Sequence, residues 1–203
     1  MINSAIKTFD IWARKGKDEG MAMAHEPSVD EMLNFSLRSL NRDFKFIDGG
    51  CGNGWVVRKV KSSPYCKKAI GVDGSLSMIN KAKEIDPKGE YLCADLLDWD
   101  PKEKVDLVHT MEVIYYFKDP MLLIEKIYDN WVLEGGRLIC GVDYYFENTD
   151  SHSWQKDLGI PMTLFSNKQW SEIFNTVGFK EVKTWVSNSK SNQSGTLIIT
   201  GVV

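Results

Sequence analysis

Short apolar runs alternate along the chain with segments whose apolar residues recur at helical spacing. The runs cover residues 44–47, 69–72, 91–93, 105–110 and 137–142. The last of them is nearly uniformly apolar after its first residue, which is typical of a parallel strand covered on both faces. Strands that alternate with helices in this way form βαβ units, so the pattern predicts an α/β fold with a parallel sheet.

Two helices are expected before the first strand. Apolar residues at helical spacing predict a helix over residues 2–13, and the glycine-punctuated segment 15–27 predicts a loop. Ser28 and Glu31 have the spacing of a capping box. The second helix is therefore expected to begin there and to run to about Asn41.

Capping residues locate two further helices. Asp119 and Pro120 are suited to the N-cap and the first position of a helix after the fourth run, which is expected to end by Gly135. A capping box opens another helix at Ser166, and Gly178 is placed to end it.

The chain after the fifth run lacks a simple period at first. Residues 143–165 are aromatic and polar and are longer than the usual connection, so this segment is either functional or mobile. Two strands at 182–186 and 196–203 then flank the polar stretch 187–195, which has the composition of a long hairpin turn. These last two strands are expected to be mutually antiparallel.

Length and composition place the chain among folded globular proteins. It has 203 residues, 43% hydrophobic and 26% charged, which favours one domain and argues against wholesale disorder. The net charge of −3 gives no basic excess, so no nucleic-acid partner is expected. No run approaches the ~18 apolar residues of a membrane helix and no signal peptide opens the chain, so we expect no membrane association and a cytoplasmic location. The four cysteines lack zinc-type spacing, so reduced thiols and no metal site are expected.

A glycine-rich turn follows the first apolar run and carries the strongest chemical signal. Residues 48–54 read DGGCGNG, in which Gly50, Gly52 and Gly54 can adopt left-handed angles and let a ligand approach the backbone closely. The helix beyond presents free N–H groups to an anion. The turn therefore predicts a nucleotide-cofactor site, although it does not match the dinucleotide fingerprint G-x-G-x-x-G. Cys51 has no adjacent cationic partner and is expected to pack and not to react.

Further motifs follow the turn in a fixed order. They are Asp73 after the second run, Cys93-Ala94-Asp95-Leu96 after the third, VDLVHTMEVIYYF at the fourth, and LEGGRLI before the fifth. Together with FIDGGCGNG they resemble the motifs of the class I S-adenosylmethionine (AdoMet)-dependent methyltransferases, in particular the small single-domain group that acts mostly on small molecules. The resemblance covers about residues 44–142. It implies a doubly wound, Rossmann-like fold with a seven-stranded, mostly parallel sheet of order 3-2-1-4-5-7-6, in which strand 7 is antiparallel.

The resemblance also implies AdoMet as cofactor and a set of residues that contact it. Asp73 would take the ribose hydroxyls and Asp95 the adenine amino group, since ionised carboxylates accept hydrogen bonds from both. Leu96 would pack on the purine, and the glycine turn would hold the methionine end. The full set comprises Asp48, Gly49, Gly50, Cys51, Gly52, Gly54, Asp73, Gly74, Met78, Asp95, Leu96 and Met111.

The catalytic residues remain open at this point. Methyl transfer from a sulfonium is an in-line displacement, so alignment and exclusion of water supply most of the rate, and the acceptor decides whether a base is needed. The candidates by position are His25, Glu112, Tyr116, Tyr144 and His152, followed by Tyr115, Asp143 and Tyr145. Tyr116 stands where many members of the family place a histidine, which argues against a histidine base there. His109, within an apolar strand, is expected in the core.

Two aromatic triplets leave the nature of the acceptor open. Residues 115–117 and 144–146 follow the fourth and fifth runs, at the edge where open α/β sheets bind ligands. They are compatible with a cage for a cationic amine and with ordinary wall packing.

The expected organisation is one domain over residues 1–203. It comprises N-terminal lid helices in 1–43, a cofactor-binding core in 44–142, a substrate-side insert in 143–165, and a C-terminal helix and strand pair in 166–203. The expected function is AdoMet-dependent methyl transfer to nitrogen or oxygen of a small polar acceptor, by a monomer or homodimer. Aminopropyl transfer with a related cofactor and non-catalytic AdoMet binding are the alternatives.

Overall fold

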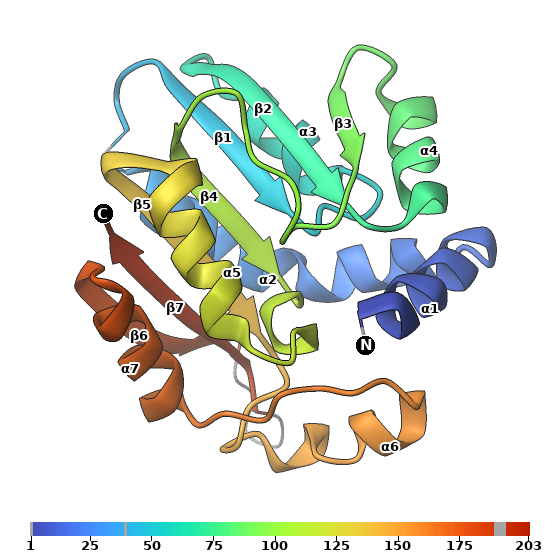
Figure 1. Cartoon of the computed structure of the whole chain (residues 1–203). Helices are drawn as coiled ribbons and strands as arrows, with labels where there is room; N and C mark the ends of the chain where they lie inside the picture. The colour runs from blue at the N-terminus through green and yellow to red at the C-terminus, as the bar shows by residue number, and fades with distance from the viewer. Residues whose placement is uncertain (1, 39, 189–193) are drawn as a thin grey trace.

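The strands form a single mixed sheet. A computed structural model describes residues 2–38, 40–188 and 194–203, and within them seven strands pair in the order β3-β2-β1-β4-β5-β7-β6 (Figure 1). β7 is antiparallel to both β5 and β6, and the other pairs are parallel. The strands are β1 (Phe44–Gly49), β2 (Cys66–Asp73), β3 (Glu90–Cys93), β4 (Val105–Met111), β5 (Val132–Val142), β6 (Lys180–Ser187) and β7 (Thr196–Val202). The strand order and the antiparallel seventh strand predicted above are confirmed.

Helices cover both faces of this sheet (Figure 1). The helices are α1 (Ile2–Arg14), α2 (Lys17–Leu37), α3 (Trp55–Lys61), α4 (Leu76–Ile85), α5 (Pro120–Lys126), α6 (Trp154–Leu158) and α7 (Asn167–Val177). Short 3-10 turns occur at η1 (Ile114–Tyr116) and η3 (Thr149–Ser151), and a π turn, η2 (Ile127–Trp131), follows α5. α2, α3 and α4 share one apolar cluster with the sheet, and α5 and α7 share the other.

The alternation of side chains along each buried strand produces these two clusters. On β1, Phe46 packs into the cluster of α2, α3 and α4, while Ile47 packs into the cluster of α5 and α7. Both side chains are fully buried, and burial of such a side chain contributes about 1.5–3 kcal/mol. A strand buried on both faces reads as a continuous apolar run, which is why the sequence located the central strands well.

The second helix begins earlier than predicted. Residues 15–27 were expected as a loop because of their glycines, yet α2 starts at Lys17 and continues through Pro27. Burial outweighs the local propensities here, since Val29 and Met32 are fully buried against the sheet. Ser28 does not cap a helix: its hydroxyl is buried and donates to Thr196 Oγ1 at 2.8 Å.

The fifth strand begins earlier than the predicted residue 137. Asp119 caps α5 and Pro120 opens it, as predicted, but the helical turns finish at Trp131 and β5 begins at Val132. Gly135 therefore lies inside a strand, where its N–H donates to the carbonyl of Val203 at 2.9 Å.

The C-terminal predictions hold where the structure describes them. Ser166 and Gln169 form the capping box of α7, and Gly178 ends that helix in a left-handed conformation. The segment 143–165 contains η3 and α6. The predicted hairpin turn at 187–195 falls largely on residues 189–193, which lie outside the described residues. Across the described ranges, no helix combines the length and the hydropathy needed to cross a membrane.

Candidate active site

A cavity of about 460 Å³ lies at the carboxyl ends of the central strands, the edge where open α/β sheets bind ligands. Its walls come from the glycine turn, from the ends of β2 and β4, and from α1, α2 and α6. The size lies within the range of about 300–1,000 Å³ that is usual for small-molecule sites. Ten residues of the predicted cofactor set line it: Asp48, Gly50, Cys51, Gly52, Asp73, Gly74, Met78, Asp95, Leu96 and Met111.

The other two predicted contacts, Gly49 and Gly54, do not line the cavity. Gly54 is the N-cap of α3 and has φ +76°, and a Cβ there would lie 2.4 Å from Tyr91 Cε1. Gly50 has φ +78°, and a Cβ there would lie 2.1 Å from Val113 Cγ2. The turn therefore needs glycine at both positions, at Gly54 for packing and at Gly50 for packing beside the cavity.

Hydrogen bonds from the backbone hold the Asp73 side chain against the glycine turn. Its Oδ2 accepts a hydrogen bond from the Gly52 N–H at 2.9 Å, and its Oδ1 accepts one from the Ser75 N–H at 2.8 Å. Burial raises the pKa of Asp73, and the two backbone N–H groups oppose that rise. Because each carboxylate oxygen has two lone pairs, Asp73 retains accepting capacity toward the cavity.

Asp95 has more accepting capacity left. Its Oδ1 accepts from the Leu97 N–H at 2.9 Å, and its Oδ2 accepts no hydrogen bond from the part of the chain that the structure describes. The buried Leu96 lies beside it in the cavity wall. The pair offers an acceptor next to an apolar surface.

Asp48 and Cys51 are buried beneath the turn. Asp48 Oδ1 lies 2.7 Å from His109 Nδ1, and the His109 side chain is fully buried, as predicted for a core residue. Burial raises the pKa of the Cys51 thiol well above its usual value. A thiol that resists ionisation is a poor nucleophile, in agreement with a packing role for Cys51.

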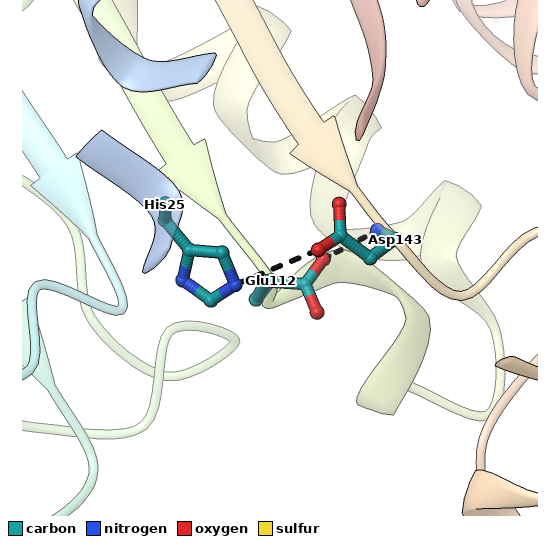
Figure 2. Close-up of side chains that lie close together, drawn as sticks. All are labelled: His25, Glu112 and Asp143. Carbon is teal, nitrogen blue, oxygen red and sulfur yellow. Dashed lines mark hydrogen bonds and ion pairs between the residues drawn. The ribbon is translucent and has the colours of Figure 1, made fainter. Parts of the chain in front are cut away.

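Three of the candidate residues form a cluster at the ends of β4 and β5 (Figure 2). Glu112 Oε1 accepts from the Asp143 N–H at 2.5 Å, and Glu112 Oε2 accepts from the Tyr115 hydroxyl at 2.6 Å. His25, from α2, places Nε2 3.5 Å from Asp143 Oδ2. Potential ligand atoms of His25, Glu112 and Asp143 lie within 4.8 Å of one another, so these residues could hold a metal ion, which the cysteine pattern did not suggest.

The charges of this cluster perturb one another. Burial raises the pKa of Glu112 to about 8, and the carboxylate of Asp143 adds to the rise. Burial disfavours the charged form of His25, but its hydrogen bond to Asp143 and the charge of Glu112 outweigh burial and raise the pKa of His25. Glu112 also has φ +60°, which is uncommon for a residue other than glycine. Shifted carboxyl and imidazole groups in a cavity are typical of catalytic or binding sites.

Of the remaining catalytic candidates, some line the cavity and others lie outside it. Tyr116 lines the cavity, and its hydroxyl oxygen lies 3.2 Å from that of Tyr115. Tyr144 is buried behind Tyr115, with ring centroids 5.5 Å apart, and does not reach the cavity. His152 is exposed, and its Nε2 lies 2.9 Å from the carbonyl of Phe146. Tyr145 donates to the carbonyl of Gly195 at 3.1 Å, so these last three side chains are placed for packing and loop structure.

Sequence reasoning expected lid helices in residues 1–43 but, apart from His25, did not single out the residues that they contribute to this wall. Asp18 is buried, and its Oδ2 accepts from Asn53 Nδ2 at 2.7 Å while its Oδ1 accepts from Lys81 Nζ at 2.9 Å. Asp18 lies in the segment predicted as a loop, and only the position of Asn53 within the glycine motif pointed to a role. Other lining residues that were missed are Phe9, Trp12, Met21, Trp154 and Asp157.

Comparisons with known proteins agree with this arrangement. A family model described as a methyltransferase domain matches residues 21–184. One similar structure is the complex between the Trm112 methyltransferase activator of Haloferax volcanii and a putative methyltransferase. The matching chain is 26% identical to this one and superposes with a TM-score of 0.82, and the match covers 96% of both chains. The N-methyltransferase NodS of Bradyrhizobium japonicum, in complex with S-adenosyl-L-homocysteine (AdoHcy), shares the fold at a TM-score of 0.67, with 20% identity over 85% of this chain and 84% of that chain.

Curated sequences give shorter matches. The trans-aconitate 2-methyltransferase of an Azoarcus species is 30% identical over 81 residues, which cover 40% of this chain and 32% of that protein. The chain spans about a third to just over half of the length of the curated relatives that it matches. The family model, in contrast, covers most of the chain. The chain therefore belongs to the methyltransferase domain family, and its resemblance to the class I AdoMet-dependent methyltransferases is confirmed.

Proposed function

We propose that this chain binds AdoMet in the cavity and catalyses transfer of the methyl group to a small polar acceptor. One observation carries the proposal: a single cavity joins the glycine turn, Asp73 and Asp95 at one end to the cluster of Glu112 and His25 at the other. The first end suits a nucleoside with an amino acid tail, and the second suits a polar group. AdoMet supplies an electrophilic methyl carbon on a sulfonium when it is bound.

The residues present fit this cofactor. Asp95 Oδ2 has no partner among the described residues, so it is available to the adenine amino group. Asp73 has accepting capacity for ribose hydroxyls while the Gly52 N–H holds its side chain in place. Met78 and Leu96 give the purine an apolar surface. A Cβ at Gly52 would meet nothing nearer than Met78 Sδ at 4.0 Å, so the backbone there is open to a ligand.

The N-terminal helices act as a lid in this proposal. Phe9 and Trp12 of α1, and Met21 and His25 of α2, contribute to the cavity wall. Such a lid would exclude water and align the acceptor with the methyl group, which is where most of the rate of this displacement arises.

The cavity does not suit trans-aconitate, the acceptor in the names of several relatives. Trans-aconitate is a carboxylic acid, and an enzyme that binds it must stabilise negative charge. Among the described residues, no lysine or arginine lines the cavity. We therefore do not extend that acceptor to this chain.

The substitution Asp73→Ala tests the cofactor site. Loss of charge-assisted hydrogen bonds to the ribose should weaken AdoMet binding by about 1–3 kcal/mol, roughly 5–150-fold in Kd. Calorimetric titration measures this change, with Asp129→Ala as a control, since Asp129 is exposed and does not line the cavity.

The same titration separates the competing classes of function. Equal affinity for decarboxylated AdoMet would favour aminopropyl transfer, and preference for NAD would indicate a dehydrogenase. Unchanged AdoMet affinity in Asp73→Ala would reject the assignment of Asp73. Incubation with methyl-labelled AdoMet and a metabolite library, read by mass, then identifies the acceptor.

A further inference from the structure

The ionisable groups that line the cavity are strongly unbalanced. Six carboxylate side chains and two imidazoles, those of His25 and His109, contribute to the wall, and the described chain places no lysine or arginine there. The carboxylates belong to Asp18, Asp48, Asp73, Asp95, Glu112 and Asp157. A cavity with this composition repels anions and attracts cations.

Some of these carboxylates already have polar protein partners. Asp18 pairs with Lys81, and Asp48 contacts His109. Asp73 and Asp95 lie at the end of the cavity that the proposed function gives to the nucleoside. Asp157 is exposed on α6 and accepts from the Ser153 hydroxyl at 2.6 Å.

Glu112 is therefore the half-buried carboxyl that faces the acceptor end, and Asp143 stands next to it. Asp143 Oδ1 is buried and has no hydrogen-bond partner in the described parts of the chain. Among the described residues, only the His25 imidazole lies beside these two adjacent carboxyl groups to balance their charge. Buried charges of one sign require a counter-charge, so this end of the cavity is complementary to a cation.

Aromatic rings surround the same end. Phe9 of α1 and Tyr116 meet edge to face with centroids 5.4 Å apart, and Tyr115 and Tyr116 lie 4.4 Å apart. Trp12 and Trp154 also line the cavity, as do Trp55 and Phe117. Aromatic faces attract ammonium groups when these are drawn out of water, and the rings also give an organic cation an apolar surface that a bare metal ion does not use.

We propose that the methyl acceptor is an amine that binds as an ammonium ion against Glu112, and that Glu112 then accepts its proton. This proposal rests on the proposed function, because it concerns the acceptor end of the same cavity. An N–H bond of the ammonium breaks, an O–H bond forms on a Glu112 carboxylate oxygen, and the nitrogen keeps the electron pair that it needs as a nucleophile. Asp143 and His25 position Glu112 and balance its charge.

Geometry favours this occupant over a divalent metal at the same residues. Both Glu112 oxygens already accept short hydrogen bonds, from the Asp143 N–H and the Tyr115 hydroxyl. His25 Nε2 is directed at Asp143 Oδ2 (Figure 2). A metal ion would need the lone pair of His25 Nε2, which carries a proton when it pairs with Asp143 Oδ2, whereas an ammonium group needs only a remaining lone pair of a carboxylate oxygen.

Matched probes test the charge preference of the acceptor end. Butyl, benzyl and 2-phenylethyl scaffolds are each offered as amine, alcohol and carboxylate to the full chain with AdoHcy bound, and binding is measured by calorimetry. At least one amine should bind, about tenfold or more tighter than its alcohol and its carboxylate. Glu112→Gln should remove this preference and leave the AdoHcy affinity unchanged. Asp143→Asn should also weaken binding of the amine relative to its alcohol and its carboxylate. Glu172→Gln, an equal change of charge on the exposed face of α7, should have no effect.

Several results would overturn the proposal. They are equal or tighter binding of the alcohol or carboxylate, failure of every amine to bind to protein that does bind AdoHcy, or an unchanged preference in Glu112→Gln. Titration with Mn²⁺ alone gives the competing outcome, since tight Mn²⁺ binding that excludes the amines and is lost in Glu112→Gln would make the cluster a metal site. Failure of AdoHcy itself to bind would instead reject the proposed function, so the two failures are distinguishable.

Discussion

Two features of Glu112 lower the stability of the folded protein. It has a positive φ, which costs of the order of 1–3 kcal/mol for a residue other than glycine. Its carboxyl is removed from water beside Asp143, and burial raises its pKa to about 8. Residues that disfavour folding in this way are concentrated at functional sites, where the surrounding structure holds them in place.

Glu112→Gln should therefore stabilise the ligand-free protein in a pH-dependent manner. The pKa of Glu112 is higher in the folded chain, at about 8, than its ordinary value of 4.5. The unfolded chain then loses its proton first as the pH rises, so wild-type stability falls through this window by at most about 1.4 kcal/mol per pH unit. Glutamine carries no such cost and can keep both hydrogen bonds.

Thermal unfolding at several pH values measures this difference. The Tm of Glu112→Gln minus that of the wild type should grow from pH 5 to pH 8 and then level off. Glu172 forms a surface ion pair with Lys168, and Glu172→Gln should show no such trend. A difference that is constant with pH would mean that Glu112 is ionised in the folded protein already at pH 5.

At the scale of elements, a carboxylate attaches α1 to the N-terminus of α4. Asp10 Oδ1 accepts from the Ser77 N–H at 2.9 Å and from the Ser75 hydroxyl at 3.0 Å, and Arg14 forms an ion pair with its other oxygen. The hydrogen bonds from Ser77, helped by Ser75 and Arg14, lower the pKa of Asp10 to about 2. A carboxylate at a helix N-terminus is stabilising because it accepts free N–H groups.

Asp10→Ala should loosen α1 from the core. Loss of an N-terminal acceptor of this kind costs about 0.5–2 kcal/mol. Amide hydrogen exchange should accelerate across residues 4–14 and stay slow in β1 and β4. Because the folded-state pKa of Asp10 is depressed, its contribution is present above pH 3.8 and is lost as the pH falls through 2. Unchanged exchange in α1 would show that its apolar contacts alone hold it.

The elements differ in how far the sequence predicts them. The central strands and the glycine turn were predictable because their signals are local: a continuous apolar run, and glycines at positions of positive φ such as Gly50. The start of α2 was not, since Pro27 and the glycines before it indicate a loop until the burial of Val29 against the sheet is known. Likewise, Glu112 could be picked out by its place after a strand, but its contact with His25 and Asp143 depends on how α2 crosses the sheet.

At the scale of the whole molecule, segments far apart in sequence enclose one cavity. Its wall draws on α1 and α2 from the N-terminus, on the turns after β1, β2 and β4, and on α6 from the segment between β5 and α7. A ligand that fills such a cavity contacts all of these elements at once. It stabilises the closed arrangement by an amount that grows with its concentration relative to Kd.

AdoHcy should therefore slow amide hydrogen exchange in α1, α2 and the glycine turn together. These elements open locally in the ligand-free protein at a lower free energy than the central strands, because they lie at the edge of the core. Exchange measured by mass spectrometry with and without AdoHcy should show protection over residues 4–25 and 50–56 and little change in β6. Asp73→Ala at the same AdoHcy concentration should show much less protection. Protection of the turn without any change in α1 and α2 would contradict the lid and would leave the N-terminal helices as a fixed part of the wall.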